Sequence, residues 1–308
     1  MNKEFLRKLY GNFDSESNNN FVLGLSGGPD SFFLLYCLKL INEDLKFNKL
    51  KIFPIIIDHK LRDESSAEAV TAQKNSLTIG FKAKIIEVRD KYSSGNMQSW
   101  ARDQRRNVLY HYAKKYNANI ILAHHYDDNI ETIFMRVLKK SGFKGLIGIK
   151  KISQLKDIKI YRPLLDFKKK QIIGFLDTKK IPYVLDKSNF NRNFDRVKTR
   201  YILKSLQNFD FKNVETNLLK LSLLSKKLVS ELDKVIKDWI AKNVKYYSHG
   251  SITVEYIQIL EIFKKNQEFS SILVGKFIKN VGGRDFFPRK KKLVQNLKNI
   301  FANVIKKF

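Results

Sequence analysis

The feature that most constrains this chain is a polar hexapeptide between two apolar runs near the N-terminus. The hexapeptide is Ser26-Gly27-Gly28-Pro29-Asp30-Ser31. The apolar run before it, residues 21–25, is short and bounded by Gly and Ser, as a buried strand is. The run after it, residues 32–40, is long enough for a buried helix. The pattern therefore predicts a strand that turns directly into a helix at residues 26–31.

A turn of this kind is suited to bind an anion, because backbone N–H groups and the positive end of the helix dipole point at one spot. The two glycines allow the backbone to approach the anion closely, and Ser26 and Ser31 add hydroxyl donors. Asp30 is a poor phosphate ligand unless a magnesium ion lies between the two groups. The alternative is an ordinary Gly-Gly turn that starts a helix. No lysine follows the glycines, so this is not the GxxxxGK[ST] loop.

Strand and helix patterns alternate from residue 21 to about residue 165. After the first strand, the predicted strands are 51–57, 84–88, 119–123 and 158–165, and the predicted helices are 65–77, 96–116 and 127–138. This alternation predicts an α/β fold with a doubly wound, mostly parallel sheet. In such sheets ligands bind beyond the carboxyl ends of the strands. The polar stretches 26–31, 58–62 and 124–131 each begin at such an end, so we expect them to converge on one crevice.

The pattern changes after residue 167. Residues 168–178 read as a basic amphipathic helix, and apolar residues recur at three- and four-residue steps from about 213 to 240. We therefore expect a domain boundary near residue 208. This gives a first domain at 1–208 and a smaller, mainly helical domain at 209–308.

The acidic stretch that starts with His124 and His125 is the second chemical signal. Asp127 and Asp128 follow, and Asp128 and Glu131 are three residues apart, so they share a helix face. Such a face can hold magnesium, an ammonium group, or both. Alternatively, the acids only complement the helix dipole. A zinc site is a weaker interpretation, because His-His-x-Asp lacks the i, i+4 spacing of a helical zinc motif.

Arg102 and Arg105 form the third signal, one turn apart on the predicted helix 96–116. Their planar, always-charged guanidinium groups can bind a phosphate together. The alternative is a solvated basic face.

Composition narrows the class of protein. The net charge is +29, from 59 basic and 30 acidic residues, which favours a polyanionic partner such as nucleic acid. An AT-biased genome would also enrich lysine. The only cysteine, Cys37, lies in an apolar run and permits no internal disulfide. The N-terminus is too mixed for a signal peptide, and no apolar run is long enough to span a membrane, so the sequence predicts no membrane association and a cytoplasmic location.

The hexapeptide resembles the PP-loop, SGGxDS, of the ATP pyrophosphatase superfamily. Further motifs resemble the tRNA(Ile)-lysidine synthetase family, in the right order over about residues 20–205. They are Asp58-His59-x-Leu61-Arg62, Ala101-Arg102-x-x-Arg105, His124-His125-x-Asp127-Asp128-x-x-Glu131-Thr132, Gly142-x-x-Gly145-Leu146-x-Gly148, Arg162-Pro163-Leu164-Leu165 and Asp186-x-Ser188-Asn189. SGGxDS alone indicates the superfamily, and the combination indicates the family.

The resemblance implies a two-step ligation. The C2 carbonyl oxygen of the wobble cytidine in the CAU anticodon of isoleucine tRNA would attack the α-phosphate of ATP and release pyrophosphate, and the ε-amine of free lysine would then attack C2 and displace AMP to give lysidine. It implies that Ser26, Gly27, Gly28, Pro29, Asp30 and Ser31 bind ATP, and that Asp30 and Asp127 hold Mg²⁺. It implies that Asp128, Glu131, Arg102, Arg105, His124 and His125 bind lysine or act in catalysis. We also expect tRNA contacts from Arg196, Arg200, Arg289 and Lys290. The resemblance implies that residues 1–208 form the ATP-binding catalytic domain and residues 209–308 the tRNA-binding domain.

Three alternatives stay open. The chain could be another PP-loop tRNA-modifying enzyme, although sulfur-inserting members need reactive or cluster-bound cysteines and this sequence contains one cysteine. It could be an amidating relative, or a tRNA-binding relative that has lost catalysis. The sequence leaves the oligomeric state open, and a homodimer is one option.

Overall fold

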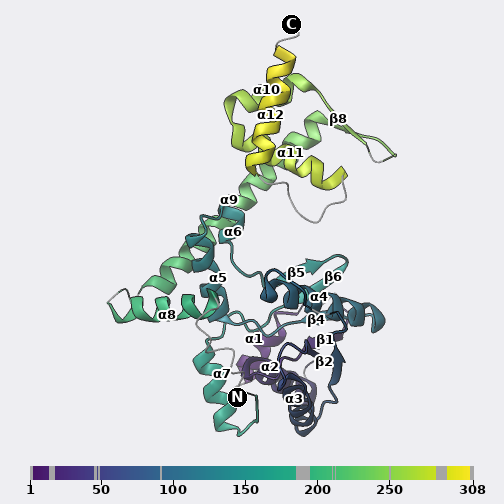
Figure 1. Ribbon diagram of the computed structural model, residues 1–308, viewed down its shortest axis with the longest axis vertical. Helices are drawn as coiled ribbons and strands as arrows, with labels where there is room; N and C mark the ends of the chain where they lie inside the picture. Colours follow the sequence, from purple (N-terminus) through teal and green to yellow (C-terminus); the bar gives the residue numbers. More distant parts are fainter. Residues whose placement is uncertain are drawn as a thin grey trace. The chain divides into compact units, whose positions relative to one another are not determined.

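The computed structural model describes residues 3–13, 18–44, 47, 49–90, 92–184, 195–209, 211, 213–249, 251–281 and 290–305 (Figure 1). By its internal contacts the chain divides into two compact units, Met1–Ser225 and Lys226–Phe308. The division lies within one long helix, α9 (Val214–Asn243). The assignment of ATP binding to residues 1–208 and of tRNA binding to residues 209–308 stays a proposal.

The first unit is built on a six-stranded sheet in the order β3-β2-β1-β4-β6-β5. The strands, in this order, are Lys84–Glu87, Lys51–Asp58, Asn20–Gly24, Asn119–Ile121, Ile158–Tyr161 and Ile152–Leu155. All neighbours pair in parallel except β5 and β6, which form an antiparallel edge hairpin. The expected α/β fold with a mostly parallel sheet is confirmed. The strand order reverses direction between β1 and β4, which is where ligands bind in sheets of this type.

Nine helices are described in the first unit or begin there (Figure 1). They are α1 (Lys3–Tyr10), α2 (Pro29–Glu43), α3 (Ser65–Ile79), α4 (Met97–Lys115), α5 (Tyr126–Leu138), α6 (Phe143–Leu146), α7 (Lys169–Thr178), α8 (Asp195–Asn208) and α9. Most predicted bounds agree within one or two residues. The predicted strand 158–165 ends earlier, at Tyr161, because Pro163 soon follows and a proline cannot donate to a sheet.

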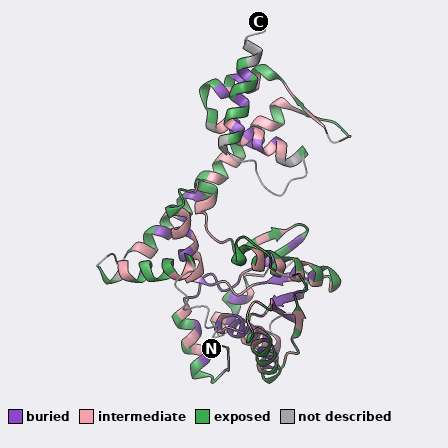
Figure 2. Ribbon diagram, in the orientation of Figure 1, coloured by how far each residue is buried: buried purple, intermediate pink, exposed green. Residues whose placement is uncertain are grey.

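Both faces of the sheet are covered, as expected. Phe21 and Leu23 of β1 pack in a core with α1, α2, α3 and α7, whereas Val22, between them, packs in a second core with Leu109 and Ala113 of α4. Successive strand residues point to opposite faces, so one strand supplies both cores. α2 is buried along most of its length (Figure 2), in agreement with its unbroken apolar sequence.

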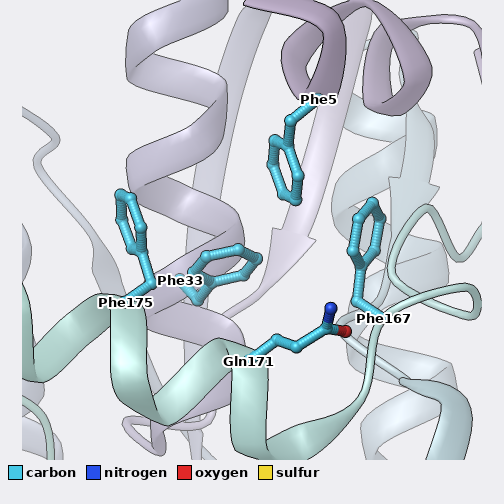
Figure 3. A pocket seen from close by; sticks show the side chains of 5 residues that line it. All are labelled: Phe5, Phe33, Phe167, Gln171 and Phe175. Atoms are coloured by element: carbon cyan, nitrogen blue, oxygen red, sulfur yellow. The ribbon is translucent and has the colours of Figure 1, made fainter. Parts of the chain in front are cut away.

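Aromatic side chains fasten α7 to α1 and α2. They surround a cavity of about 190 Å³, and Figure 3 shows its lining: Phe5, Phe33, Phe167, Gln171 and Phe175. The Phe33 ring lies 5.3 Å from that of Phe175, edge to face, and the Phe5 ring lies 4.6 Å from that of Phe167. This packing fixes the start of α7 beside the start of α2, which becomes important below.

The second unit is mainly helical, as the sequence predicts. Its elements after α9 are a two-stranded hairpin, β7 (Val244–Tyr246) and β8 (Ile252–Val254), and the helices α10 (Tyr256–Lys265), α11 (Gln267–Val281) and α12 (Lys290–Ile305). Ile236, Phe263, Leu273 and Phe301 form its buried core. Among the described residues, no helix is both long and apolar enough to cross a membrane.

Replacement of Phe21 tests the first core. We expect Phe21→Ala to lower the free energy of unfolding by about 3–5 kcal/mol, because the side chain is fully buried and its removal leaves a cavity. The Phe21 ring also packs edge to face on Tyr161, at 5.7 Å. Urea unfolding of the full chain measures the loss. Phe143→Ala, at a position 57% exposed, is the matched control and should change stability by less than about 0.5 kcal/mol.

Candidate active site

The hexapeptide joins β1 to α2 and is held by its own hydrogen bonds. Gly27 has a φ of +84°, a conformation that favours glycine, and its carbonyl accepts a 2.9 Å hydrogen bond from the N–H of Val184. The Ser31 hydroxyl donates to the carbonyl of Gly28 at 2.9 Å, and the Ser26 hydroxyl donates to that of Ser31 at 3.2 Å. In this structure the two hydroxyls therefore shape the loop, and the Ser26 hydroxyl also accepts from the N–H of Gly28 at 3.4 Å. The other backbone N–H groups at the start of α2 are the donors left for an anion.

The N-terminus of α2 carries no side-chain cap in the described part of the chain. Its N-cap is Gly28, and its first residue is Pro29, which suits this position because it lacks an N–H. The first N–H groups of a helix have no partner within the helix. The positive end of the α2 dipole is thus available to an anion at the edge of the sheet where the strand order reverses.

Asp30, the second residue of α2, forms an ion pair with Lys169. The Lys169 ammonium lies 2.6 Å from each Asp30 carboxylate oxygen. Lys169 is the first residue of α7, and its backbone N–H donates to Asp127 Oδ2 at 2.8 Å. The sequence analysis missed Lys169, whose only signal was its place in the basic run 168–170.

His125 connects the loop to the acidic stretch. It is the N-cap of α5, and its buried ring lies near three carboxylates: Nε2 is 3.7 Å from Asp30 and 3.6 Å from Asp128, and Nδ1 is 3.4 Å from Asp127. Burial opposes the charged imidazolium, but the hydrogen bond to Asp127 and the charges of Asp128 and Asp30 outweigh it, so the pKa of His125 is raised. The predicted convergence of the polar stretches is thus confirmed for residues 26–31 and 124–131.

Asp128 and Glu131 differ in their electrostatic surroundings. Burial raises the pKa of Glu131, although the Arg200 guanidinium donates to its Oε1 at 2.8 Å. The other oxygen, Oε2, is buried and has no hydrogen-bond partner among the described residues. For Asp128, burial is outweighed by the charge of His125, the backbone hydrogen bond from His125 and the charge of Arg196, so its pKa is lowered. Two carboxyls on one helix face therefore differ in proton affinity.

Arginines from two helices lie in this part of the structure: Arg196 acts on Asp128 and Glu131, and Arg105 acts on His124. Arg102 and Arg105 are on α4, and Arg196 is on α8. Burial lowers the pKa of Arg102 and of Arg105, and the positive charge of Arg196 lowers both pKa values further. Arg196 also helps to keep Asp128 ionised. The structure thus places Arg196, which we expected to contact tRNA, near the predicted catalytic residue Asp128. Arg200, also expected to contact tRNA, joins the same group through its hydrogen bond to Glu131.

His124 is a neutral imidazole in this setting. Burial, with the nearby charges of Arg162, Arg196 and Arg105, lowers its pKa to about 3, although Asp128 opposes the shift. Its Nδ1 is buried without a hydrogen-bond partner in the part of the chain that the structure describes. His124 can therefore offer a neutral donor or acceptor to a bound molecule.

A few predicted residues lie elsewhere. Asp186, Ser188, Asn189 and Arg289 fall outside the described residues, and Lys290 begins α12 in the second unit. Asp58 is buried at the end of β2 and accepts hydrogen bonds from Ser65, Ser66 and the N–H of Lys60, so it holds the turn after that strand.

The described residues contain no group of three His, Cys, Asp or Glu side chains placed to hold a metal ion. Asp30 offers carboxylate oxygens, the donors that Mg²⁺ prefers, but both accept from Lys169. Asp127 is committed to the Lys169 N–H and to His125. The donor set fits a magnesium ion only if a bound ligand supplies most of its coordination.

Known proteins are similar to this chain. The PP-loop domain family matches residues 1–206. A tRNA(Ile)-lysidine synthase of Mycoplasma mycoides is 30% identical over 236 residues, which are 75% of this chain and 55% of that protein. The synthase of Chlamydia caviae is also 30% identical, over 80% of this chain and 77% of that protein. The chain spans about half the length of several such relatives.

A solved structure shares the fold. The U34-tRNA thiolase NcsA of Methanococcus maripaludis, solved with its [4Fe-4S] cluster, superposes with a TM-score of 0.61 at 18% identity, over 73% of this chain and 78% of that chain. At this identity the likeness speaks for the fold alone. With the family match over residues 1–206 and the Chlamydia caviae relative covered over most of its length, the chain belongs to the PP-loop family and, within it, to the tRNA(Ile)-lysidine synthase family.

Proposed function

We propose that this protein uses ATP to attach lysine to C2 of the wobble cytidine in the CAU anticodon of isoleucine tRNA. The observation that carries the proposal is the short path from Asp30 through His125 to Asp128, with separations of 3.7 and 3.6 Å. It joins an anion-binding helix start to an acid pair in one site, as a ligase needs if it activates one substrate with ATP and couples an amine to it. Membership of the synthase family supports the choice of substrates.

In the first step, the C2 carbonyl oxygen of the cytidine attacks the α-phosphorus of ATP, and pyrophosphate leaves. The N-terminus of α2 and the loop 26–31 hold the departing pyrophosphate. Negative charge develops on the α-phosphate as the new P–O bond forms. Arg102, Arg105 and Arg196 stabilise this charge with groups that are already in place, so little reorganisation is needed.

In the second step, the ε-amine of lysine attacks C2, and AMP leaves with the former carbonyl oxygen. The amine enters as an ammonium ion and must lose a proton to act as a nucleophile. Asp128 stays ionised and binds a lysine ammonium, whereas Glu131, with its raised pKa, accepts the proton. The two carboxyls thus take different roles because burial and nearby cations act on them differently.

Mg²⁺ would enter with the ATP phosphates and take one ligand from Asp30, with Asp127 close by. Magnesium is commonly bound by one or two carboxylates together with substrate phosphates and water. Bound there, it would neutralise phosphate charge. The second unit, with Lys290 at the start of α12, is the proposed tRNA-binding domain, in a cytoplasmic protein that can be a homodimer.

Radiolabelled lysine tests the proposal. We expect the full chain to incorporate lysine into an isoleucine tRNA transcript in the presence of ATP and Mg²⁺, and to release one AMP per lysine. A methionine tRNA, which shares the CAU anticodon, is the control and should stay unlabelled. ATP hydrolysis without transfer of lysine to tRNA would rule out the proposed reaction and favour another PP-loop activity.

Asp30→Ala separates nucleotide activation from tRNA binding. We expect adenylated tRNA to fall by at least about 100-fold, because Mg²⁺ loses its protein ligand beside the phosphates. tRNA affinity, measured by filter binding, should stay within about twofold, because Asp30 is proposed to hold no RNA. Asp157→Ala removes an exposed acid of the β5–β6 hairpin, paired with Lys114, and serves as the matched control. Equal loss of adenylation and tRNA binding would contradict this role of Asp30.

Glu131→Gln tests the proposed proton acceptor. We expect lysine transfer to slow by about 10²–10⁴-fold while adenylation continues, so that adenylated tRNA accumulates. In the unaltered protein, transfer should fall as the pH drops through the raised pKa of Glu131, because protonation removes the base. The variant should lack this limb of the pH profile. An unchanged profile would assign the proton to another group.

The raised pKa of Glu131 also makes the free energy of unfolding depend on pH. The folded state binds the Glu131 proton more tightly than the unfolded state, so this contribution is present at low pH and is lost as the pH rises through the folded-state pKa. Thermal unfolding at several pH values measures this slope, which Glu131→Gln should remove.

A further inference from the structure

Lys169 is the one cation that contacts Asp30 with a short ion pair in the described residues. Its ammonium lies equally close, at 2.6 Å, to both carboxylate oxygens. Neither side chain is deeply buried: Lys169 is 34% exposed and Asp30 is 26% exposed. An ion pair with this much solvent access adds at most about 1 kcal/mol to stability, so stability alone is a weak reason for its presence.

The backbone of Lys169 is held firmly, and its side chain is partly exposed to solvent. Its N–H is bound by Asp127, and the backbone N–H of Lys168 is capped by the Gln171 side chain at 2.9 Å. Phe33 and Phe175 lock α7 onto α2 (Figure 3). The Lys169 ammonium therefore lies at the end of a four-carbon side chain that starts from a fixed backbone position, next to the uncapped N-terminus of α2.

The pair conflicts with the proposed use of Asp30. A carboxylate that accepts hydrogen bonds from one ammonium through both of its oxygens has reduced capacity to bind Mg²⁺. When ATP arrives with its metal, the ammonium needs another anion, and the nearest one would be the pyrophosphate group at the start of α2. Lysine suits such an exchange, because it is a compact charge with three donors on a four-carbon stem.

We propose that Lys169 is a pyrophosphate-binding residue that changes partners: it neutralises Asp30 in the free protein and binds an oxygen of the β- or γ-phosphate when ATP enters. This inference rests on the proposed use of ATP. It adds a residue on α7 to the phosphate site, which otherwise consists of the loop 26–31 and the start of α2. The exchange keeps the site close to charge balance before and after the nucleotide binds.

Calorimetric titration of the full chain with ATP, inorganic pyrophosphate and AMP tests the proposal without an activity assay. We expect Lys169→Gln to weaken binding of ATP and pyrophosphate by about tenfold or more, because a hydrogen bond to a charged group is lost. AMP, which lacks the β- and γ-phosphates, should bind within about twofold of the unaltered protein. Lys169→Arg should retain most of the pyrophosphate affinity. Lys170→Gln removes the same charge from the next, exposed position and should change nothing.

A second measurement starts from Asp30, the other member of the ion pair. With Mg²⁺ removed by a chelator, Asp30→Asn frees the Lys169 ammonium and should tighten pyrophosphate binding by about threefold or more. Lys169→Gln added to Asp30→Asn should abolish this gain. A gain that persists in the double variant would come from removal of the acid alone and would overturn the proposal.

The outcomes separate the inference from the proposed function. Equal weakening of ATP and AMP in Lys169→Gln would make Lys169 a structural residue and overturn the inference, while the proposed reaction would stand. Unchanged ATP affinity would overturn it as well. Failure of the unaltered protein to bind ATP or pyrophosphate would overturn the proposed function, and the inference with it.

Discussion

The arrangement of the site depends on the His125 ring, which lies within 3.7 Å of carboxylate oxygens from Asp30, Asp127 and Asp128. Three carboxylates this close together repel one another strongly when they are partly removed from water. A buried imidazole with a raised pKa offsets part of that repulsion, and Lys169 offsets more from the other side of Asp30. The fold brings the acids together because α2 and α5 both begin at the edge of the sheet where the strand order reverses.

Much of this arrangement follows from the sequence because it is local. The Gly-Gly turn after an apolar strand, and acids spaced three apart at a helix start, each predict their own geometry from a few adjacent residues. The parallel sheet follows from strand–helix alternation. The meeting of residues 26–31 with 124–131 could also be predicted, because the carboxyl ends of neighbouring parallel strands share an edge.

What the sequence analysis missed depends on contacts between distant segments. Lys169 pairs with Asp30 across 139 positions, and Arg200 with Glu131 across 69. In a chain with 59 basic residues, no local pattern marks Lys169 as different from its neighbours, and none shows that Arg200, which we expected to contact tRNA, pairs with Glu131. The antiparallel β5 was missed for a related reason. Its four residues alternate between exposed and half-buried positions, and so short a segment resembles an ordinary loop until β6 pairs with it.

The arginines show why the site favours an anion. Arg102, Arg105 and Arg196 come from two helices. Beyond the effect of burial, the charge of Arg196 lowers the pKa of both Arg102 and Arg105, and the charge of Arg102 lowers that of Arg105 further, so this repulsion costs the folded protein stability. Guanidinium groups remain protonated at any physiological pH, so loss of a proton cannot relieve the repulsion. An anion placed among them can. The folding energy therefore holds the positive charges in position in advance, and in the proposed reaction they would stabilise a phosphate that gains negative charge without further rearrangement of the protein.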